Sequence, residues 1–571
     1  MDNETVGHVL AAGLKRHGVS MIFGQSIPVG LFHVTPQYGI RQMAYRAENA
    51  GGIMADGFAR ISGRLGVVTA QNGPAATLLV PPLAEALKAS VPVLAIVEEV
   101  PRGDVERNAF QEYDHLALFA SCTKWARRLD RPERAADFLD MAVTAATSGR
   151  PGPVALMVPR DLFGEPARAG LARNADLGFY PLDRFGPDPA RITEAAALLA
   201  SAKRPIIVAG GGVHLSGAAE QVVELSRLTS IPVATTNMGK GVIDERSPLA
   251  LGVFGNTMGA GAGVSHLISY AAEADVVLFV GCRTNENATA GWKLYNPHAR
   301  FIHIDMDPRE IGRNYEALRL VGDARTAVAG LIAALRDADF SARAVVREQI
   351  ASDIARARQA QAANLVTVGK GVVGAIRPEH LMSVLDRRLA PDDIVVADAS
   401  YSTNWLATYL TSKRDGARFL LPRGLAGLGW GLPLAMGAKV ARPSAQVFAI
   451  VGDGGFAHCW AELEAAKRMG VNVTTIVLNN SILGFQCHGE NAFVGGHSHA
   501  VDLGPVDHAA IARACGCYGE RVDDPDAFEA ALDRCLASGA PAVLDVLVDS
   551  KAHPPLTILE GRDVSGAPID S

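Results

Sequence analysis

The sequence predicts an α/β protein with three doubly wound domains, each built on a parallel sheet that helices cover on both faces. Short apolar segments typical of buried strands alternate with helix-like segments along the chain. A chain of 571 residues exceeds what one hydrophobic core supports, and at roughly 150 residues per domain it predicts three or four domains, of which we expect three. Hydrophobic residues make up 49% of the chain and 58 residues are glycine, which is typical of soluble proteins with many strand-to-helix turns.

The predicted strands are continuous apolar runs rather than alternating ones. Such runs indicate strands that are buried on both faces, as in parallel sheets between helical layers. In chain order they cover residues 66–70, 91–99, 205–210, 275–281, 301–305, 393–400, 446–454, 473–480 and 542–548.

Two segments of different composition divide the chain. Residues 164–190 are rich in Gly, Pro and Asp, and residues 340–376 are polar and helix-prone, which marks both as linkers. Each part between them has the usual size of a domain. The predicted domains cover residues 1–165, 190–340 and 375–555.

Charge and composition exclude several classes of partner. The formal net charge is -6 and no run of Lys or Arg is present, so the protein is not expected to bind nucleic acid or an anionic membrane surface. No stretch of eighteen apolar residues predicts a membrane span, and the N-terminus reads as an amphipathic helix rather than a signal peptide. The seven cysteines form no CxxC pair. We therefore expect reduced thiols and a cytoplasmic location.

The strongest local signal is a glycine-rich turn followed by a pair of asparagines. A buried strand ends in GDGG at residues 452–455, and a helical segment leads to a second strand that ends in Asn479-Asn480. Glycines let the backbone approach an anion, and the helix that follows offers free N–H groups and a positive dipole end. The turn therefore fits a diphosphate.

The same segment supplies oxygen ligands for a divalent cation. Asp453 and Asn480, 27 residues apart, lie at the ends of neighbouring strands, and the carbonyl of Ile482 could add a third oxygen. This donor set suits Mg²⁺, which also takes phosphate oxygens and water. A lone GDGG is equally consistent with an ordinary strand-to-helix turn, and it is the Asn pair at this distance that favours a metal–diphosphate site.

The GDG-to-NN spacing resembles the thiamine diphosphate motif, and the resemblance extends over nearly the whole chain to the acetolactate synthase and pyruvate oxidase family. It implies an N-terminal pyrimidine-binding domain, a central nucleotide-binding-like domain and a C-terminal diphosphate-binding domain. Besides the GDG-to-NN segment, the matching segments are FGQSIP at 23–28, AENAGGIMADGFAR at 47–60, QNGPAAT at 71–77, FQEYD at 110–114, RPGPVALMVPRD at 150–161, AGGGVHLSG at 209–217, TTNMGKG at 235–241, HIDMDP at 303–308 and GLGWGLPLAMGA at 427–438.

The family implies specific roles for the residues that hold thiamine diphosphate and Mg²⁺. Glu48 would hydrogen-bond the pyrimidine and promote loss of the proton on the thiazolium C2, although by itself it reads more simply as a carboxylate at a helix N-terminus. The Leu428 side chain would wedge the cofactor into its bent shape. The implied cofactor-binding residues are Glu48, Asn72, Tyr401, Ser402, Ala426, Leu428, Gly452, Asp453, Gly454, Gly455, Asn480 and Ile482. The implied metal ligands are Asp453, Asn480 and Ile482.

The substrate side points to a 2-oxo acid. Phe110 and Gln111 match the aromatic and the amide that line the reaction side in acetolactate synthases, and Arg160 stands where a lysine is common. A basic group near the mouth would favour an anionic substrate. A core phenylalanine and a surface arginine remain the alternatives. The leading interpretation is decarboxylation of pyruvate or a similar 2-oxo acid and carboligation to a second carbonyl. The candidate substrate residues also include Gln25, Ser26, Ile27, Phe485 and Gln486.

Two departures from the family keep other functions open. The loop Gln25-Ser26-Ile27 looks like that of oxalyl-CoA decarboxylase and 2-hydroxyacyl-CoA lyase, so an acyl-CoA substrate is the first alternative. GCRTNENAT at 281–289 replaces the GxRFDDR stretch of relatives that bind FAD, which speaks against FAD. FAD, ADP, CoA or no ligand therefore stay open for the central domain. Sulfoacetaldehyde acetyltransferase and a non-catalytic homologue are further alternatives.

The resemblance also implies a homo-oligomer. In this family the pyrimidine domain of one subunit meets the diphosphate domain of another, so the active unit is at least a dimer, and many relatives are tetramers. The small residues Ala50, Gly51, Gly52 and Ala55 are expected to allow close packing against another subunit.

Overall fold

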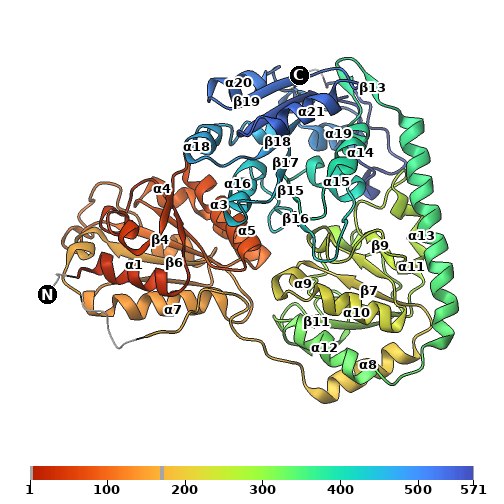
Figure 1. Ribbon diagram of the computed structural model, residues 1–571, viewed down its shortest axis with the longest axis horizontal. Helices are drawn as coiled ribbons and strands as arrows, with labels where there is room; N and C mark the ends of the chain where they lie inside the picture. The colour runs from red at the N-terminus through yellow and green to blue at the C-terminus, as the bar shows by residue number, and fades with distance from the viewer. Residues whose placement is uncertain (1–3, 168–172, 570–571) are drawn as a thin grey trace.

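The computed structural model describes residues 4–167 and 173–569, and these residues form three six-stranded sheets (Figure 1). Every pairing within the three sheets is parallel, and helices lie on both faces of each sheet. The predicted fold class is therefore confirmed. Part of the linker expected at 164–190 lies outside the described residues.

The N-terminal sheet has the strand order β2-β1-β3-β4-β6-β5. Its strands are β1 (Met21–Phe23), β2 (Arg41–Met43), β3 (Gly66–Ala70), β4 (Val93–Glu99), β5 (Trp125–Arg128) and β6 (Val154–Pro159). The helices around it are α1 (Val6–Arg16), α2 (Val29–Phe32), α3 (Glu48–Ser62), α4 (Pro74–Leu78), α5 (Val80–Ala89), α6 (His115–Ala120) and α7 (Ala135–Thr147).

The central sheet has the order β12-β11-β10-β7-β8-β9. Its strands are β7 (Pro205–Ala209), β8 (Val233–Thr235), β9 (Ala250–Val253), β10 (Val276–Val280), β11 (Arg300–Asp305) and β12 (Ala317–Val321). Its helices are α8 (Pro189–Ser201), α9 (Gly211–Ser216), α10 (Ala219–Thr229), α11 (Ser269–Ala272) and α12 (Ala324–Leu335).

The C-terminal sheet has the order β16-β15-β17-β18-β20-β19. Its strands are β15 (Ile394–Ala397), β16 (Arg418–Leu420), β17 (Val447–Gly452), β18 (Thr474–Asn479), β19 (Tyr518–Val522) and β20 (Ala542–Leu547). Its helices are α14 (Pro378–Arg388), α15 (Tyr401–Tyr409), α16 (Gly431–Ala441), α17 (Asp453–Phe456), α18 (Glu462–Met469), α19 (Gly484–Val494), α20 (His508–Ala514) and α21 (Phe528–Ala537).

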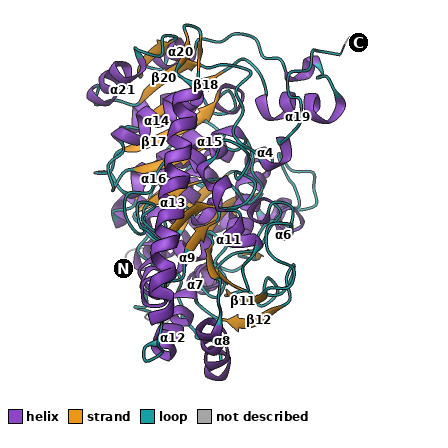
Figure 2. Cartoon of the chain, turned by 90° about the vertical axis from the view of Figure 1, so that its right-hand side faces the viewer, coloured by secondary structure: helices purple, strands orange, loops and turns teal. Residues whose placement is uncertain are grey.

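A long helix connects the central and C-terminal sheets. It is α13 (Ser341–Val368), which falls within the segment predicted to be polar and helix-prone, and it runs along one side of the molecule (Figures 1 and 2). A short antiparallel pair, β13 (Gly371–Val372) and β14 (Ala375–Ile376), follows it. In the described residues, no helix combines the length and the apolar character needed to cross a membrane.

The N-terminal and C-terminal sheets share one strand order and one hydrophobic core. If β1 to β6 are matched with β15 to β20 in sequence, the two orders are identical. Helices α3 and α16 take the same place in this scheme and pack against each other inside the shared core. A Cβ on Gly57 would lie 2.3 Å from the Leu434 carbonyl oxygen, and one on Gly437 would lie 2.0 Å from that of Met54. The contact between the two helices is therefore reciprocal and requires glycine on both sides.

Candidate active site

A pocket of about 640 Å³ opens at the carboxyl ends of the C-terminal strands. Parallel strands place their carboxyl ends at one edge of a sheet, where ligands of α/β proteins bind. The pocket brings together eleven of the residues predicted to bind cofactor or substrate. These are Tyr401, Ser402, Leu428, Gly452, Asp453, Gly454, Gly455, Asn480, Ile482, Phe485 and Gln486.

Strand pairing puts the GDG turn next to the asparagines. Gly452 at the end of β17 is paired with Leu478 of β18, so Asp453 and Asn480 follow neighbouring strand ends. The Asp453 carboxylate accepts a hydrogen bond of 2.7 Å from the Ser481 N–H, and the Asn480 amide oxygen accepts one of 3.3 Å from the Ile482 N–H. Ser481 has a positive φ of 56°, which turns the chain back toward the GDG segment. One carboxylate, one amide and one carbonyl are thus available at the same end of the pocket.

The surroundings of Asp453 fit a bound cation. The residue is 6% exposed, and burial raises the pKa of its carboxyl group to about 6. Backbone N–H groups are its partners among the described residues, so a cation such as Mg²⁺ would offset the cost of burying the charge.

The turn also leaves room for a diphosphate. A Cβ on Gly455 would lie 2.3 Å from an Asp398 carboxylate oxygen, and one on Gly454 would lie 2.8 Å from Leu483. Side chains at these two positions would therefore fill the cradle. The residues present fit both a diphosphate and Mg²⁺.

Tyr401 and Ser402 begin the helix that follows β15. Ser400 has a positive φ of 64°, which turns the chain into α15. Both side chains are buried and line the pocket. The Tyr401 hydroxyl lies 3.0 Å from Nδ1 of His488, whose other ring nitrogen lies 3.0 Å from the Ser550 carbonyl oxygen. Tyr401 is therefore held in place from α19 and the C-terminal segment.

Asp398 supports the loop that carries Ala426 and Leu428, and the sequence analysis missed it. Its carboxylate accepts hydrogen bonds from the Gly429 N–H at 3.0 Å and the Trp430 N–H at 3.1 Å. Ala426 has a positive φ of 63°, and Leu428 projects at the rim of the pocket with 36% of its surface exposed. The signal was present, because Asp398 is a polar residue within the predicted strand at 393–400 and directly follows β15 in the structure.

The predicted residues of the N-terminal domain lie apart from this pocket. Glu48 is the first residue of α3; it is partly exposed, and its carboxylate makes no hydrogen bond or ion pair with any residue that the structure describes. The Asn72 amide is buried and donates to the carbonyls of Phe110 at 3.1 Å and Gln111 at 3.0 Å. Asn72 thus fixes the segment that carries the aromatic and the amide.

The candidate substrate residues form an exposed surface. Phe110 is 81% exposed, so the alternative of a core phenylalanine is wrong. The Gln25 amide donates at 2.9 Å to the carbonyls of Tyr45 and Arg46, and Ser26 and Ile27 follow it in the same loop. Arg160 has an exposed side chain, as the alternative of a surface arginine states.

Arg160 does not carry an isolated positive charge. Its Nε lies 2.8 Å from the buried carboxylate of Glu98. The basic group expected at the mouth of the site is therefore partly neutralised.

Two of the small residues of α3 pack within the chain. A Cβ on Gly51 would lie 2.2 Å from the Tyr45 ring, and one on Gly52 would lie 2.6 Å from Pro82. The expectation that these two glycines allow close packing against another subunit is wrong, because their neighbours belong to the same chain. Ala50 and Ala55 are buried in the shared core as well.

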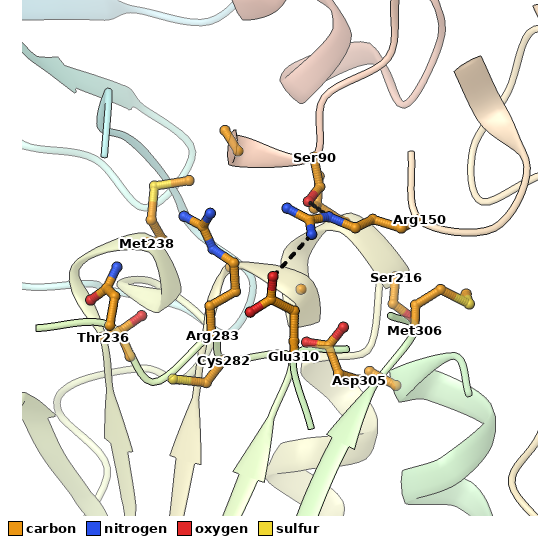
Figure 3. A pocket seen from close by; sticks show the side chains of 18 of the residues that line it. Ser90, Arg150, Ser216, Thr236, Met238, Cys282, Arg283, Asp305, Met306 and Glu310 are labelled. Atoms are coloured by element: carbon orange, nitrogen blue, oxygen red, sulfur yellow. Dashed lines mark hydrogen bonds and ion pairs between the residues drawn. The ribbon is translucent and has the colours of Figure 1, made fainter. Parts of the chain in front are cut away.

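A second pocket of about 1030 Å³ lies over the carboxyl ends of the central strands (Figure 3). The GGG turn at residues 210–212 and Asp305 line it, as the glycine-rich turn predicted. Arg150 lies 3.2 Å from Glu310, and the guanidinium groups of Arg150 and Arg283 project on either side of that carboxylate. Burial and the nearby Arg150 lower the pKa of Arg283, which has no carboxylate partner among the described residues. The pocket therefore suits a ligand with negative charge.

Comparison with known proteins identifies the family of all three domains. The thiamine pyrophosphate enzyme N-terminal TPP binding domain matches residues 4–118, the central domain matches residues 192–331, and the C-terminal TPP binding domain matches residues 398–546. The order of the three matches follows the order of the three sheets.

Full-length relatives agree with this assignment. A probable acetolactate synthase large subunit of Methanocaldococcus jannaschii is 34% identical over 96% of this chain and 93% of its own length. Acetolactate synthases of Mycobacterium bovis, 32% identical over 96% of this chain and 89% of theirs, and of Arthrospira platensis, 31% identical over 98% and 97%, are also similar. The chain belongs to the thiamine pyrophosphate enzyme family, and it is an enzyme that depends on this cofactor.

Proposed function

We propose that the protein decarboxylates a 2-oxo acid and joins the remaining carbon unit to a second carbonyl. The observation that carries this proposal is the pocket at the GDG and NN strand ends in a chain that resembles acetolactate synthases over nearly its full length. Thiamine diphosphate, when bound, supplies the electron sink that carbanion chemistry beside a carbonyl requires. Relatives named acetolactate synthase favour this function over the acyl-CoA and sulfoacetaldehyde alternatives.

The C-terminal domain would hold the charged end of the cofactor. Oxygens of Asp453 and Asn480 and the Ile482 carbonyl are proposed to bind Mg²⁺, because they are hard ligands at one end of the pocket. The N–H groups of Gly454 and Gly455 would take up phosphate oxygens at the start of α17. Tyr401 and Ser402 would contact the same diphosphate from α15.

The other end of the cofactor needs a carboxyl group, and Glu48 is proposed to supply it from a second copy of the chain. The pocket that holds Asp453 is lined by residues 378–552, so the described chain alone offers no carboxylate of the N-terminal domain there. Glu48 itself is partly exposed, and its carboxylate makes no hydrogen bond or ion pair with any described residue. The Ala426 backbone and the Leu428 side chain would hold the pyrimidine from the C-terminal side. A homodimer that joins the two surfaces would complete each site.

The substrate would bind where the two surfaces meet. Both carry exposed apolar side chains, among them Phe110 and Val29 on one and Leu428 and Phe485 on the other, and such groups favour burial at an interface. Gln111 would orient the substrate from the first surface. The remaining proposed substrate contacts are Gln25, Ser26, Ile27, Arg160 and Gln486.

Purified protein tests this function directly. It should consume pyruvate in the presence of thiamine diphosphate and Mg²⁺ and form acetolactate, with other 2-oxo acids screened in parallel. Unchanged 2-oxo acid across the whole set, with correctly folded protein, would remove the proposal.

We also infer that the central pocket binds a ligand that contains a nucleoside diphosphate. Arg283 and Arg423 line it with guanidinium groups that no carboxylate of the described residues pairs, and the glycine turn at 210–212 allows phosphates to approach. The finer choice between FAD and ADP follows from the visible spectrum of the purified protein and from titration calorimetry with ADP. An absence of flavin absorbance together with no heat on adding ADP would refute nucleotide binding.

A further inference from the structure

The segment just before the helix that carries Glu48 is held by a residue of the C-terminal domain. The N-cap residue of α3, Ala47, has no side chain that could accept a hydrogen bond. The Glu462 carboxylate instead holds the two N–H groups just before the helix: it accepts from the Arg46 N–H at 3.0 and 3.1 Å and from the Ala47 N–H at 2.9 Å. Glu462 is the first residue of α18, nine residues after Asp453, and it is 1% exposed. One buried carboxylate thus joins the Glu48 turn to the GDG segment.

A second buried carboxylate makes the opposite connection. Glu85 of α5 is fully buried and accepts from the N–H groups of Gly424 at 2.7 Å, Leu425 at 2.5 Å and Ala426 at 3.3 Å. A Cβ on Gly424 would lie 2.6 Å from the Glu85 carbonyl oxygen, so glycine is needed for this approach. The N-terminal domain therefore holds the loop that precedes α16.

The two connections are equivalent by the internal symmetry of the fold. Glu85 lies on α5, between β3 and β4, and Glu462 lies on α18, between the matching strands β17 and β18. Each carboxylate holds the segment before the helix that takes the same place in the other domain, α3 or α16 (Figure 1). In both cases the carboxylate and the backbone segment that it holds lie at matched positions of the two domains. The arrangement is therefore a feature of the interface between the domains rather than a single local contact.

Hydrogen bonds of this kind fix backbone position strongly. An ionised acceptor roughly doubles the strength of a hydrogen bond, and a buried N–H without an acceptor costs about 1–3 kcal/mol. Burial also raises the pKa of Glu462 to about 7, which shows that its environment opposes the charge that the N–H groups favour.

We propose that Glu462 and Glu85 are positioning residues for the cofactor site, the first for Glu48 and the second for the Ala426 and Leu428 loop. This inference rests on the proposed function, in which those two segments act on the pyrimidine. Both contacts lie within one chain, whereas Glu48 and the GDG segment of that chain would serve different cofactors of a dimer. Each carboxylate therefore also ties one cofactor site to the other.

Hydrogen exchange on the protein without cofactor tests the positioning directly. Glu462→Gln removes the charge and one of the two acceptor oxygens, so it should speed exchange of the N–H groups of Arg46 and Ala47 by about 5- to 150-fold at pH 8, which corresponds to a loss of about 1–3 kcal/mol. Glu85→Gln should do the same at residues 424–426 and leave residues 46–47 unchanged. Glu464→Gln is the control for loss of a nearby charge: Glu464 is partly exposed on the same helix and pairs with the Arg46 side chain at 3.7 Å, but it accepts from neither backbone N–H group.

Activity provides the second readout. Glu462→Gln should lower kcat about tenfold or more while the affinity for thiamine diphosphate and Mg²⁺ changes less, because the diphosphate end of the site is intact. Glu462→Asp keeps the charge and should recover part of kcat. If the glutamine variant does not fold, the aspartate variant is measured in its place.

The outcomes separate the two proposals. Unchanged exchange at residues 46–47 in folded Glu462→Gln protein, or an equal effect of Glu464→Gln, would overturn the positioning role. If exchange at residues 46–47 changes but the parent protein converts no 2-oxo acid, the positioning of the Glu48 turn is supported and the proposed function is refuted.

Discussion

Glu48 begins α3 with a partly exposed carboxylate that no described residue of the chain engages. If it acts on the pyrimidine of the cofactor, Glu48→Gln removes the proton that the tautomer requires without changing the size of the side chain. We expect kcat to fall by about 10²- to 10⁴-fold, the usual contribution of a positioned acid or base. Steady-state kinetics and titration of thiamine diphosphate measure the effect on turnover and on binding separately. Turnover equal to that of the parent protein would show that Glu48 has no catalytic role.

The Asp398 carboxyl group should make the free energy of unfolding depend on pH, and the direction of its pKa shift gives the sign of that dependence. Burial raises the pKa of its carboxyl group to about 6 from an ordinary value of 3.8. The folded protein then holds this proton more tightly than the unfolded chain does, so the stabilisation is complete below about pH 4 and is lost as the pH rises through about 6.

Asp398→Asn removes this titration. In urea unfolding of the protein without cofactor, the free energy of unfolding of the parent should fall relative to that of the variant between about pH 4 and pH 7, and the difference should be constant above that range. A difference that does not change with pH would mean that Asp398 titrates normally.

The residues of the site differ in how far sequence could predict them. Asp453 and Asn480 were predicted as neighbours because parallel strands with a helical crossover put both strand ends at one edge. Glu85 and Glu462 were not predicted. Each bonds backbone N–H groups more than 300 residues away, and a backbone donor leaves no mark on the sequence. Only the packing of α3 on α16 brings these partners together.

Among the elements, most strands in the middle of the sheets were predicted and none of the strands at the edges was. The nine predicted runs correspond to strands with at least two neighbours, such as β3, β10 and β17, all of whose residues or nearly all are buried. The missed edge strands, for example β12 and β19, have residues that are only partly buried and carry polar side chains. An edge strand needs no continuous apolar run, so hydrophobicity alone does not reveal it. Three strands inside the sheets were missed as well: the short strands β1 and β8, and β6, although all residues of β6 are buried.

The contact between α3 and α16 leads to a prediction about stability. Gly437→Ala would put a Cβ 2.0 Å from the Met54 carbonyl oxygen, and the two backbones would have to move apart. We expect a loss of about 1–3 kcal/mol in the free energy of unfolding, as for other overpacked cores. Gly330→Ala in α12 is the control, because its nearest neighbours are Ile192 side-chain atoms at 3.5 Å. The control should be stabilised by up to about 1 kcal/mol in the same urea titration. Equal effects of both substitutions would show that the helices tolerate separation.

At the scale of the whole molecule, the three-domain architecture was predictable from the sequence. Whether one chain supplies all residues of a cofactor site was not. Alternation of strands and helices fixes the class of fold, and domain size fixes the number of domains. Whether Glu48 and Asp453 serve one cofactor depends on surfaces that meet only if two copies associate. Phe110 and Leu428 are both exposed, as the proposal that two such surfaces join at one site requires.

Two inactive variants test whether the site is shared between copies. Glu48→Gln damages the N-terminal half and Asp453→Ala damages the C-terminal half, so each variant alone should be inactive. In a mixed dimer, one site would combine both damaged halves and the other would combine both intact halves. Coexpression in equal amounts should therefore restore about a quarter of the parent activity, since about half of the dimers are mixed and each has one working site. If each chain builds its own complete site, every site in the mixture carries one damaged half and no activity returns. Mixing each variant with more of itself, at the same total concentration, controls for effects of concentration on assembly.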